Sequence, residues 1–442
     1  MGEAEQDAME AASKLSDRSM QSLPFDPANP KAALAALPQS SAVFALYGAD
    51  ARAEPYIGRT PNLQSRLARL LQPSAKHPRR LQLAGRVRRI AWRLTGSEFE
   101  SLLLQFHLLQ KVYGAKCLER MHLRAPAFVR FLGSNPYPRV TVTHRPSQRE
   151  SAWSYGPFPS RAAAERYVDE ALKLFLLRRC TFELDPDPSF PGCVYSEMKM
   201  CLAPCFKGCS DERYADESAA VQSFLSTRGE SRLVTLRTQR DQASADLAFE
   251  SAAALHAQVQ RVESVRALAP ELVRPLSRLR AVILQASANP GQVAVFLFEN
   301  GSLRGPAPFS TLGMRIQNEQ SGSTSLFAQP LAVEPIPELP APDAASPQAV
   351  SEAPSAAPSK LPRNLLESRL EAVLAELSAP ASAPSSTLRQ GHLALLKRWY
   401  YRPEAKRAGE IFYPGADDGW PIKSILRGIG RVAAEKLKPS IS

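Results

Sequence analysis

The chain has 442 residues, which suggests two or three domains, and its hydrophobic content of 44% is enough for ordinary cores. No apolar run approaches the ~20 residues that cross a bilayer, so the sequence argues against a membrane-spanning helix. The net charge is +12, and residues 51–150 alone carry 19 Lys and Arg against 5 Asp and Glu. A basic segment on a near-neutral remainder indicates a polyanionic partner, most simply nucleic acid, with a merely soluble basic surface as the alternative.

The first 38 residues predict a disordered tail. Residues 1–30 mix acidic residues with Ala, Ser and Met and lack a periodic apolar face. No charged segment followed by an apolar one opens the chain. We therefore expect no secretion signal and a cytoplasmic protein.

A β-hairpin followed by a helix is expected next. The run Ser41–Tyr47 predicts a strand, and Tyr56–Gly58 predicts a short return strand. Thr60 fits the N-cap of a helix that carries Arg66 and Arg69 on one face, where they can meet phosphates. An apolar stripe at helical spacing lies on another face of this helix: Leu63, Leu67, Leu70 and Leu71.

Further elements follow from periodicity and turn residues. Ser97 and Glu100 form the S-x-x-E capping box of a helix, so Glu100 has a structural task at the helix start. The remaining expected elements are a strand at 137–143, a helix at 161–177, helices within 211–268, a β-hairpin at 281–305 and helices at 362–378 and 388–410. The segment 330–362 holds nine prolines among Ala, Ser and Glu and predicts a disordered linker.

Five of the six cysteines fall within thirty residues: Cys180, Cys193, Cys201, Cys205 and Cys209. Clustered thiolates in a reducing compartment usually hold a metal or an iron–sulfur cluster, whereas buried free cysteines would be the structural alternative. Cys201 and Cys205 are four apart, about one helical turn, so both can face one centre. Spacing alone does not separate zinc from a four-iron cluster.

The N-terminal part resembles a GIY-YIG nuclease domain. The resemblance is carried by Tyr56-Ile-Gly58, by Arg59 and by Arg66, eight residues past Gly58. It implies that Tyr56 and a basic residue position or activate a water and that an arginine contacts the scissile phosphate. It also implies a carboxylate on the later helix that binds one Mg²⁺ or Mn²⁺.

Two positions depart from the GIY-YIG pattern. Phe44 stands where the family has its first tyrosine, and Gln105 stands at the family's metal-binding glutamate. A neutral amide is a poor ligand for a hard cation, and Glu100, five residues away, is off that helix face and only a weak substitute. The catalytic centre is therefore expected to be degenerate, and an inactive nuclease fold is one of two outcomes that we consider.

The segment Ser154-Tyr-Gly-Pro-Phe-Pro-Ser160 and the cysteines that follow resemble the bacterial UvrC excinucleases. The resemblance implies that Cys180, Cys193, Cys201 and Cys205 hold a 4Fe–4S cluster, with zinc as the alternative. The run Leu247–Ala253 is similar to the UVR motif, a helical hairpin that binds the UvrB-type helicase subunit. It implies partner-binding residues on the second helix of this hairpin: Phe249, Glu250, Ala252 and Ala253. Phe249 is expected on the apolar side with Leu255.

Together these signals predict an α/β (α+β) chain that resembles a UvrC truncated before its RNase-H-like and helix-hairpin-helix domains. The expected function is DNA binding in nucleotide excision repair, with metal-dependent phosphodiester hydrolysis by family. The alternative is an inactive DNA-binding or regulatory adaptor. The expected segments are a tail (1–38), a GIY-YIG-type domain (39–125), a cysteine-cluster region (126–215), a UVR-like hairpin (216–270), a β-hairpin region (271–328), a disordered linker (329–362) and a helical C-terminal segment (363–442).

Overall fold

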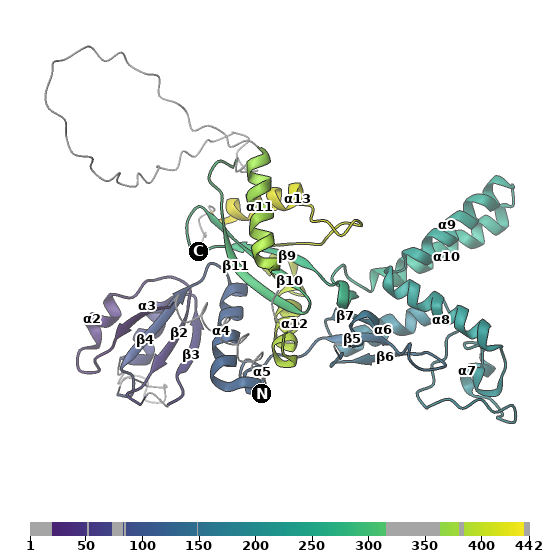
Figure 1. The fold of residues 1–442 in the computed structure, drawn as a ribbon, viewed down its shortest axis with the longest axis horizontal. Coiled ribbons are helices and arrows are strands. Elements are labelled where there is room, and N and C mark those ends of the chain that lie inside the picture. Colours follow the sequence, from purple (N-terminus) through teal and green to yellow (C-terminus); the bar gives the residue numbers. More distant parts are fainter. Residues whose placement is uncertain are drawn as a thin grey trace, which may run out of the picture.

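The computed structural model describes residues 20–50, 53–72, 83, 85–147, 149–314, 363–379 and 384–436. Within these residues the chain forms three antiparallel four-stranded sheets with helices between and around them, which confirms the predicted mixed α/β class (Figure 1). The proline-rich linker lies outside the described residues. Among the helices that the structure describes, none is long and apolar enough to cross a membrane.

The first sheet has the strand order β1-β4-β2-β3. Its strands are β1 (Gln21–Pro24), β2 (Ala42–Tyr47), β3 (Tyr56–Thr60) and β4 (Arg89–Leu94), with helices α2 (Pro30–Ala35) and α3 (Leu63–Leu71). The four leucines of the predicted stripe on α3 are all buried in the core of this sheet. The predicted hairpin, β2 with β3, and the helix after it are therefore confirmed.

Two predictions for this region are wrong. Residues 20–38, assigned to the disordered tail, contain β1 and α2, because Phe25, Leu34 and Leu37 are buried in the same core. Thr60 ends β3 and is not the N-cap of α3. Asn62 caps that helix, with its side-chain oxygen accepting the backbone N–H of Ser65 at 2.9 Å.

Helix α4 (Glu98–Tyr113) is apolar on two faces and is followed by the short α5 (Cys117–Arg120). Leu104 and Leu108 pack with Val43 of β2. On another face Phe99 and Phe106 belong to a separate core that includes the second sheet and α12 (Ser386–Tyr400). The helix therefore joins the N-terminal sheet to the C-terminal part of the chain.

The second sheet has the order β11-β10-β9-β12. Its strands are β9 (Ala281–Ala286), β10 (Gln292–Glu299), β11 (Ser302–Ser310) and β12 (Glu410–Phe412), and α11 (Arg363–Ser378) and α13 (Ile422–Lys436) pack against it. The predicted β-hairpin is confirmed and gains a third consecutive strand. The helix expected at 388–410 ends at Tyr400, because Pro403 cannot continue it, and the chain returns as β12.

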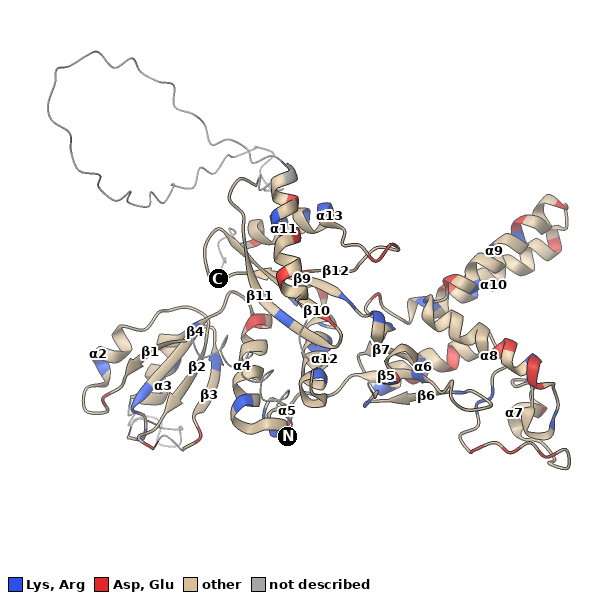
Figure 2. Cartoon of the chain, in the orientation of Figure 1, with Lys and Arg blue, Asp and Glu red and all other residues tan. Residues whose placement is uncertain are grey.

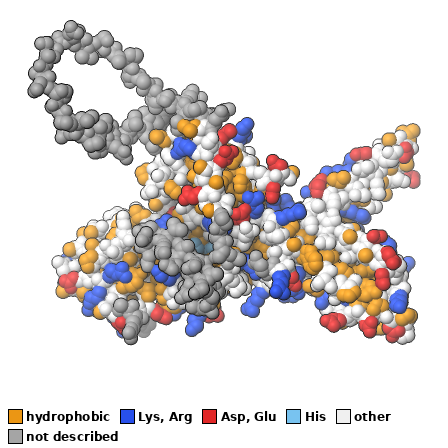
Figure 3. Space-filling model, viewed as in Figure 1, with side chains coloured by type: hydrophobic (Ala, Val, Ile, Leu, Met, Phe, Trp, Pro, Cys, Tyr) orange, Lys and Arg blue, Asp and Glu red, His pale blue; other side chains and the backbone are white. Residues whose placement is uncertain are grey.

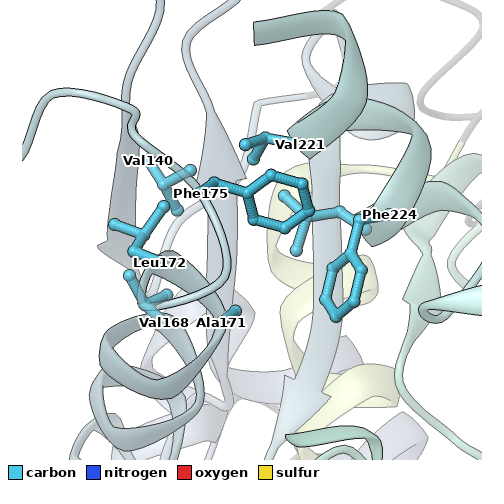
Figure 4. A pocket seen from close by; sticks show the side chains of 8 residues that line it. Val140, Val168, Ala171, Leu172, Phe175, Val221 and Phe224 are labelled. Atoms are coloured by element: carbon cyan, nitrogen blue, oxygen red, sulfur yellow. The ribbon is translucent and has the colours of Figure 1, made fainter. Parts of the chain in front are cut away.

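The third sheet, in the order β6-β5-β7-β8, supports the cysteine segment. It consists of β5 (Ala127–Phe131), β6 (Val140–Thr143), β7 (Ser154–Phe158) and β8 (Arg274–Pro275), with α6 (Arg161–Leu172) and α8 (Asp211–Ser226) beside it. Figure 4 shows an apolar hollow between β6, α6 and α8, where the rings of Phe175 and Phe224 meet edge to face with centroids 5.4 Å apart. This apolar packing fixes both ends of the cysteine segment.

The remaining helices form an antiparallel pair that projects from the body of the molecule (Figure 1). They are α9 (Glu230–Ala245) and α10 (Phe249–Ala267). Their bases pack into the core of the third sheet through Leu233, Leu236, Val259, Val262 and Val265, and most residues farther out are exposed.

A histidine pair connects α4 to α12, with His392 buried and His107 half-buried. The backbone N–H of Leu303 donates to Nδ1 of His392 at 2.9 Å, so neutral His392 carries its proton on Nε2 and donates it to Nε2 of His107 at 3.0 Å. Burial lowers the pKa of His107 to about 4 and holds the pKa of His392 well below its usual value. Helix α12 thus packs on β11 at Leu303 and on α4 at His107.

We predict that acid weakens the fold through this pair. The unfolded histidines take up protons as the pH falls through about 6.5, whereas His107 in the folded chain does so only near pH 4. The stabilisation is therefore complete above about pH 6.5 and is lost as the pH falls toward 4. Thermal unfolding should show a midpoint that drops by several degrees between pH 7 and 5, and this dependence should flatten in His107→Gln. The exposed His256→Gln is the control, and equal pH profiles for His107→Gln and wild type would contradict the prediction.

Candidate functional site

Position 44, where the GIY-YIG pattern has its first tyrosine, lies in the core of the first sheet. Phe44 is fully buried in β2, and its ring centroid lies 6.1 Å from that of Tyr56, which is half-buried. The Phe44 ring also covers Gly58, since a Cβ placed on that glycine would lie 2.7 Å from Cζ. Glycine is required there by the close approach of the ring. No hydroxyl stands at position 44 to pass a proton.

Tyr56 and Arg59 point to opposite faces of β3, because they are three residues apart on one strand. Tyr56 packs against the core under α3, whereas the Arg59 guanidinium donates to Oε1 of Glu98 at 3.2 Å at the start of α4. Among the described residues, no hydrogen bond or ion pair joins Arg66 of α3 or Gln105 of α4 to either of them. Both side chains are half-buried. The sequence motif is therefore present, but its polar groups do not interact directly with one another.

Sequence reasoning missed Arg402, which completes the environment of Arg59. Its guanidinium makes a two-pronged ion pair with Glu98, at 2.7 and 2.8 Å. This hydrogen bond, reinforced by Arg59, lowers the pKa of Glu98 to about 2. The same carboxylate thus holds one arginine from the N-terminal sheet and one from the C-terminal segment. No local signal could reveal the pair, because the partners are 304 residues apart.

Glu100 has the structural role that the capping box predicts. Only 6% of it is exposed, and its Oε2 accepts the backbone N–H of Gly96 at 2.8 Å, one residue before the N-cap itself. Ser97 Oγ accepts the N–H of Glu100 at 3.1 Å. Burial raises the pKa of this carboxyl, which disfavours the charged form that a hard cation requires. Glu100 is therefore not positioned as a substitute metal ligand.

The four predicted ligand cysteines lie in the segment between α6 and α8, which also contains α7 (Val194–Glu197). Burial above all, with smaller contributions from the charges of Cys180, Cys205 and Cys193, raises the pKa of Cys201 to about 11. The cysteines whose charges act on the Cys201 thiol are thus the same three that the family resemblance groups with it as ligands. In the part of the chain that the structure describes, no three ligand side chains stand in a geometry ready for a metal ion.

Cys209 lies apart from this group. Burial and then Asp211 raise the pKa of its thiol, and Cys205 is the one cysteine whose charge contributes. The fifth cysteine is therefore at the edge of the centre.

The backbone around the cysteines is turned rather than helical. Ala203 has φ of +55°, so the prediction that Cys201 and Cys205 lie one helical turn apart is wrong. Instead, the N–H of Ala203 donates to Sγ of Cys201 at 3.3 Å, and Pro204 opens a short 3₁₀ turn. Lys199 and Lys207 also have positive φ. A backbone held in this sparsely populated region indicates a local constraint around the thiols.

The charged and hydrophobic side chains on the surface are distributed unevenly over the molecule. Figure 2 shows Lys and Arg on α12 and around β5, acidic residues at α8, and both signs of charge on α4 and along the α9–α10 pair, whose Lys and Arg are balanced by Asp and Glu. Figure 3 shows hydrophobic side chains gathered over the lobe of α7 and α8, where Phe182, Val194 and Met198 are exposed. The charges favour contact with a polyanion at the body of the molecule and not at the projecting hairpin.

The predicted partner-binding residues lie at the tip of the α9–α10 pair. Phe249 is 66% exposed, and Leu247 beside it is 72% exposed. The expectation that Phe249 lies on the apolar side is therefore wrong, because α10 starts at this residue, beyond the packed base. Leu255 does pack against the core. Of the other predicted residues, Glu250 and Ala253 are exposed and Ala252 is half-buried.

Comparison with known proteins agrees with this organisation. Residues 128–224 match the family model described as UvrC/Cho excinuclease, middle domain. This segment runs from β5 to α8 and contains all five clustered cysteines. The chain is a UvrC-related protein. No solved structure matches it significantly.

Curated relatives are distant and longer. The UvrABC system protein C of Alcanivorax borkumensis is 31% identical over 211 residues, which cover 48% of this chain and 34% of that protein. The protein of the same name from Ruminiclostridium cellulolyticum is 27% identical over 297 residues, or 66% of this chain and 47% of the relative. The chain thus spans between a third and a half of the length of these relatives.

We predict that the two departures from the nuclease pattern respond differently to reversal. Phe44→Tyr adds a hydroxyl to a fully buried ring and should lower the free energy of unfolding by about 1–3 kcal/mol. Gln105→Glu changes a half-buried side chain on α4 and should stay within about 0.5 kcal/mol. Urea unfolding at pH 7 measures both. A Phe44→Tyr variant as stable as wild type would show that the hydroxyl finds room and a partner.

Proposed function

We propose that this protein is a UvrC-like DNA-binding component of bacterial nucleotide excision repair. The basic GIY-YIG-type part contacts DNA, the cysteine centre braces the middle domain, and the projecting hairpin recruits a UvrB-type helicase subunit. The observation that carries the proposal is the middle-domain match, which contains the four predicted ligand cysteines. A cytoplasmic location follows from this role.

The nuclease centre is inferred to be inactive in the form that the GIY-YIG family uses. Hydrolysis of a phosphodiester would need Mg²⁺ or Mn²⁺ held by a carboxylate, and Gln105 offers only a neutral amide. The nearest carboxylate to Arg59 is Glu98, which already binds two guanidinium groups. The protein therefore acts as a DNA-binding adaptor. Incision through another ligand set is the second candidate, because Tyr56, Arg59 and Arg66 are retained.

The cofactor proposed for the cysteine centre is a 4Fe–4S cluster, with zinc as the alternative. Cys180, Cys193, Cys201 and Cys205 would hold it, since both groups accept four thiolates. The fit is supported by the N–H donated to Cys201 and by the buried guanidinium of Arg178, one nitrogen of which has no hydrogen-bond partner. A bound group would brace the turned backbone between α6 and α8.

The metal proposal predicts the colour and composition of the pure protein. Anaerobically purified wild type should be brown and contain about four irons per chain. Cys201→Ala should lose the iron and become susceptible to proteolysis within 180–210. Cys209→Ser should keep the iron and the resistance to proteolysis, because Cys209 lies outside the group of four. Colourless protein with one zinc per chain would replace the cluster by a zinc site. Protein without either metal would overturn the cysteine centre.

The inactive centre predicts how the protein behaves with damaged duplex DNA. With excision partners and Mg²⁺ or Mn²⁺, wild type should bind with an affinity that falls steeply with salt, yet make little or no incision. Gln105→Glu should raise any incision by restoring the metal anchor. Efficient incision by wild type that is abolished by Arg66→Ala or Tyr56→Phe would establish the second candidate function instead.

The exposed hairpin tip predicts a separable partner site. Phe249→Ala with Glu250→Ala should weaken binding to the UvrB-type subunit at least tenfold, because exposed aromatic anchors contribute strongly to interfaces. DNA affinity should be nearly unchanged, since the tip lies outside the basic body. Val234→Ala removes another exposed apolar side chain, from α9, and serves as the matched control. Calorimetric titration that gives equal affinities for wild type and double variant would exclude this site.

A further inference from the structure

Arg178 is the largest of the fully buried side chains, with 1% of its surface exposed, and it lies two residues before Cys180. Burying a guanidinium is costly unless the charge is paired and its donors are satisfied. The backbone N–H of Arg178 donates to the hydroxyl of Tyr214 at 3.2 Å, which fixes the residue against α8. The backbone of Arg178 is therefore fixed, although burial disfavours the charge that its side chain carries.

The guanidinium has no carboxylate partner among the described residues. Its Nε donates to the carbonyl of Tyr137 at 2.9 Å, and Nη1 donates to the carbonyl of Phe182 at 3.0 Å. Nη1 also lies 3.6 Å from Sγ of Cys180. The remaining nitrogen, Nη2, is buried and has no acceptor. Among the described residues, the one side-chain acceptor that the guanidinium itself contacts is the thiol of Cys180.

A second guanidinium stands in the same neighbourhood. Burial lowers the pKa of Arg139, the charge of Arg178 lowers it further, and Cys180 opposes this effect. Arg178 is buried and Arg139 is half-buried, and two cations near Cys180 favour an anion beside them. Four thiolates around Zn²⁺, or around an oxidised four-iron cluster, carry two negative charges, so either group would supply that anion.

We propose that Arg178 is the built-in counter-ion of the cysteine centre and positions Cys180 for its ligand role. This inference rests on the metal site of the proposed function. The guanidinium neutralises part of the negative charge that four thiolates bring into a buried place. Nη1 orients the Cys180 sulfur, and Nη2 remains available as a donor to the bound group. Without a metal group, Arg178 would only tie together the carbonyls of Tyr137 and Phe182.

The test compares Arg178→Gln and Arg178→Lys with Arg179→Gln. Arg179 is the matched control, because its guanidinium donates to the carbonyl of Leu172 at the end of α6. Metal retention is measured by competition with a chelator, for zinc or iron according to what wild type holds. Arg178→Gln should lose affinity by roughly 10- to 100-fold, as removal of other outer partners of metal ligands does. Arg178→Lys, which keeps the charge but not the planar fork, should lose less.

Further readouts separate the counter-ion role from a structural one. If wild type holds iron, the reduction potential of Arg178→Gln should shift to more negative values, because the lost cation favoured the more negative reduced state, and Arg178→Lys should shift it less. Equal loss of affinity in the Gln and Lys variants, with an unchanged potential where iron is bound, would overturn the proposal. A metal affinity of Arg178→Gln equal to that of wild type would also overturn it.

If Arg178→Gln does not fold, Arg178→Lys decides the question: a metal affinity of this variant no better than that of Cys180→Ala overturns the proposal. Wild type without metal would overturn the cysteine centre itself.

Discussion

Helix α4 is the element on which the arrangement of the chain depends. A helix that is apolar on two faces must be covered on both, and α4 meets this requirement with β2 on one side and with the C-terminal core on the other. Burial of these side chains supplies the association, and the polar contacts at Glu98 and His107 give it a unique register. The N-terminal sheet and the last helices are therefore parts of one packed body, although they are far apart in sequence.

Glu98 places a constraint on how the basic body meets DNA. Its carboxylate already sits between Arg59 and Arg402, where a phosphate would otherwise find two guanidinium groups. A phosphate that contacts Arg59 must compete with a carboxylate of strongly lowered pKa, which stays charged under all physiological conditions. Arg66 has no carboxylate partner among the described residues, so a phosphate that contacts it meets no such competition. Under the proposed function, the face that carries Arg59 would thus be better suited to holding DNA than to concentrating positive charge on one scissile phosphate.

Local patterns predicted the local structure well. The hairpin of β2 and β3, the stripe of leucines on α3, the cap at Ser97 and the β-hairpin at 281–305 all follow from short-range periodicity and turn residues, whereas the third strand of that region, β11, was not predicted. Elements whose partners are distant in sequence were missed: β1 pairs with β4, and β12 pairs with β9 across more than a hundred residues. The contacts of Arg402 and His392 were missed for the same reason. The grouping of the cysteines around one centre stays a prediction from their density and from family resemblance. The turned backbone at Ala203 was missed, since a positive φ at alanine has no signal in sequence.

The α9–α10 pair sets a distance within any assembly that this protein joins. Nineteen residues of α10 at about 1.5 Å each extend for roughly 28 Å, and only the inner part is packed against the body. Under the proposed function, a subunit bound at Phe249 would be held at the end of this arm, away from the basic surface. Such an arm would let the two proteins engage the same DNA at separate places.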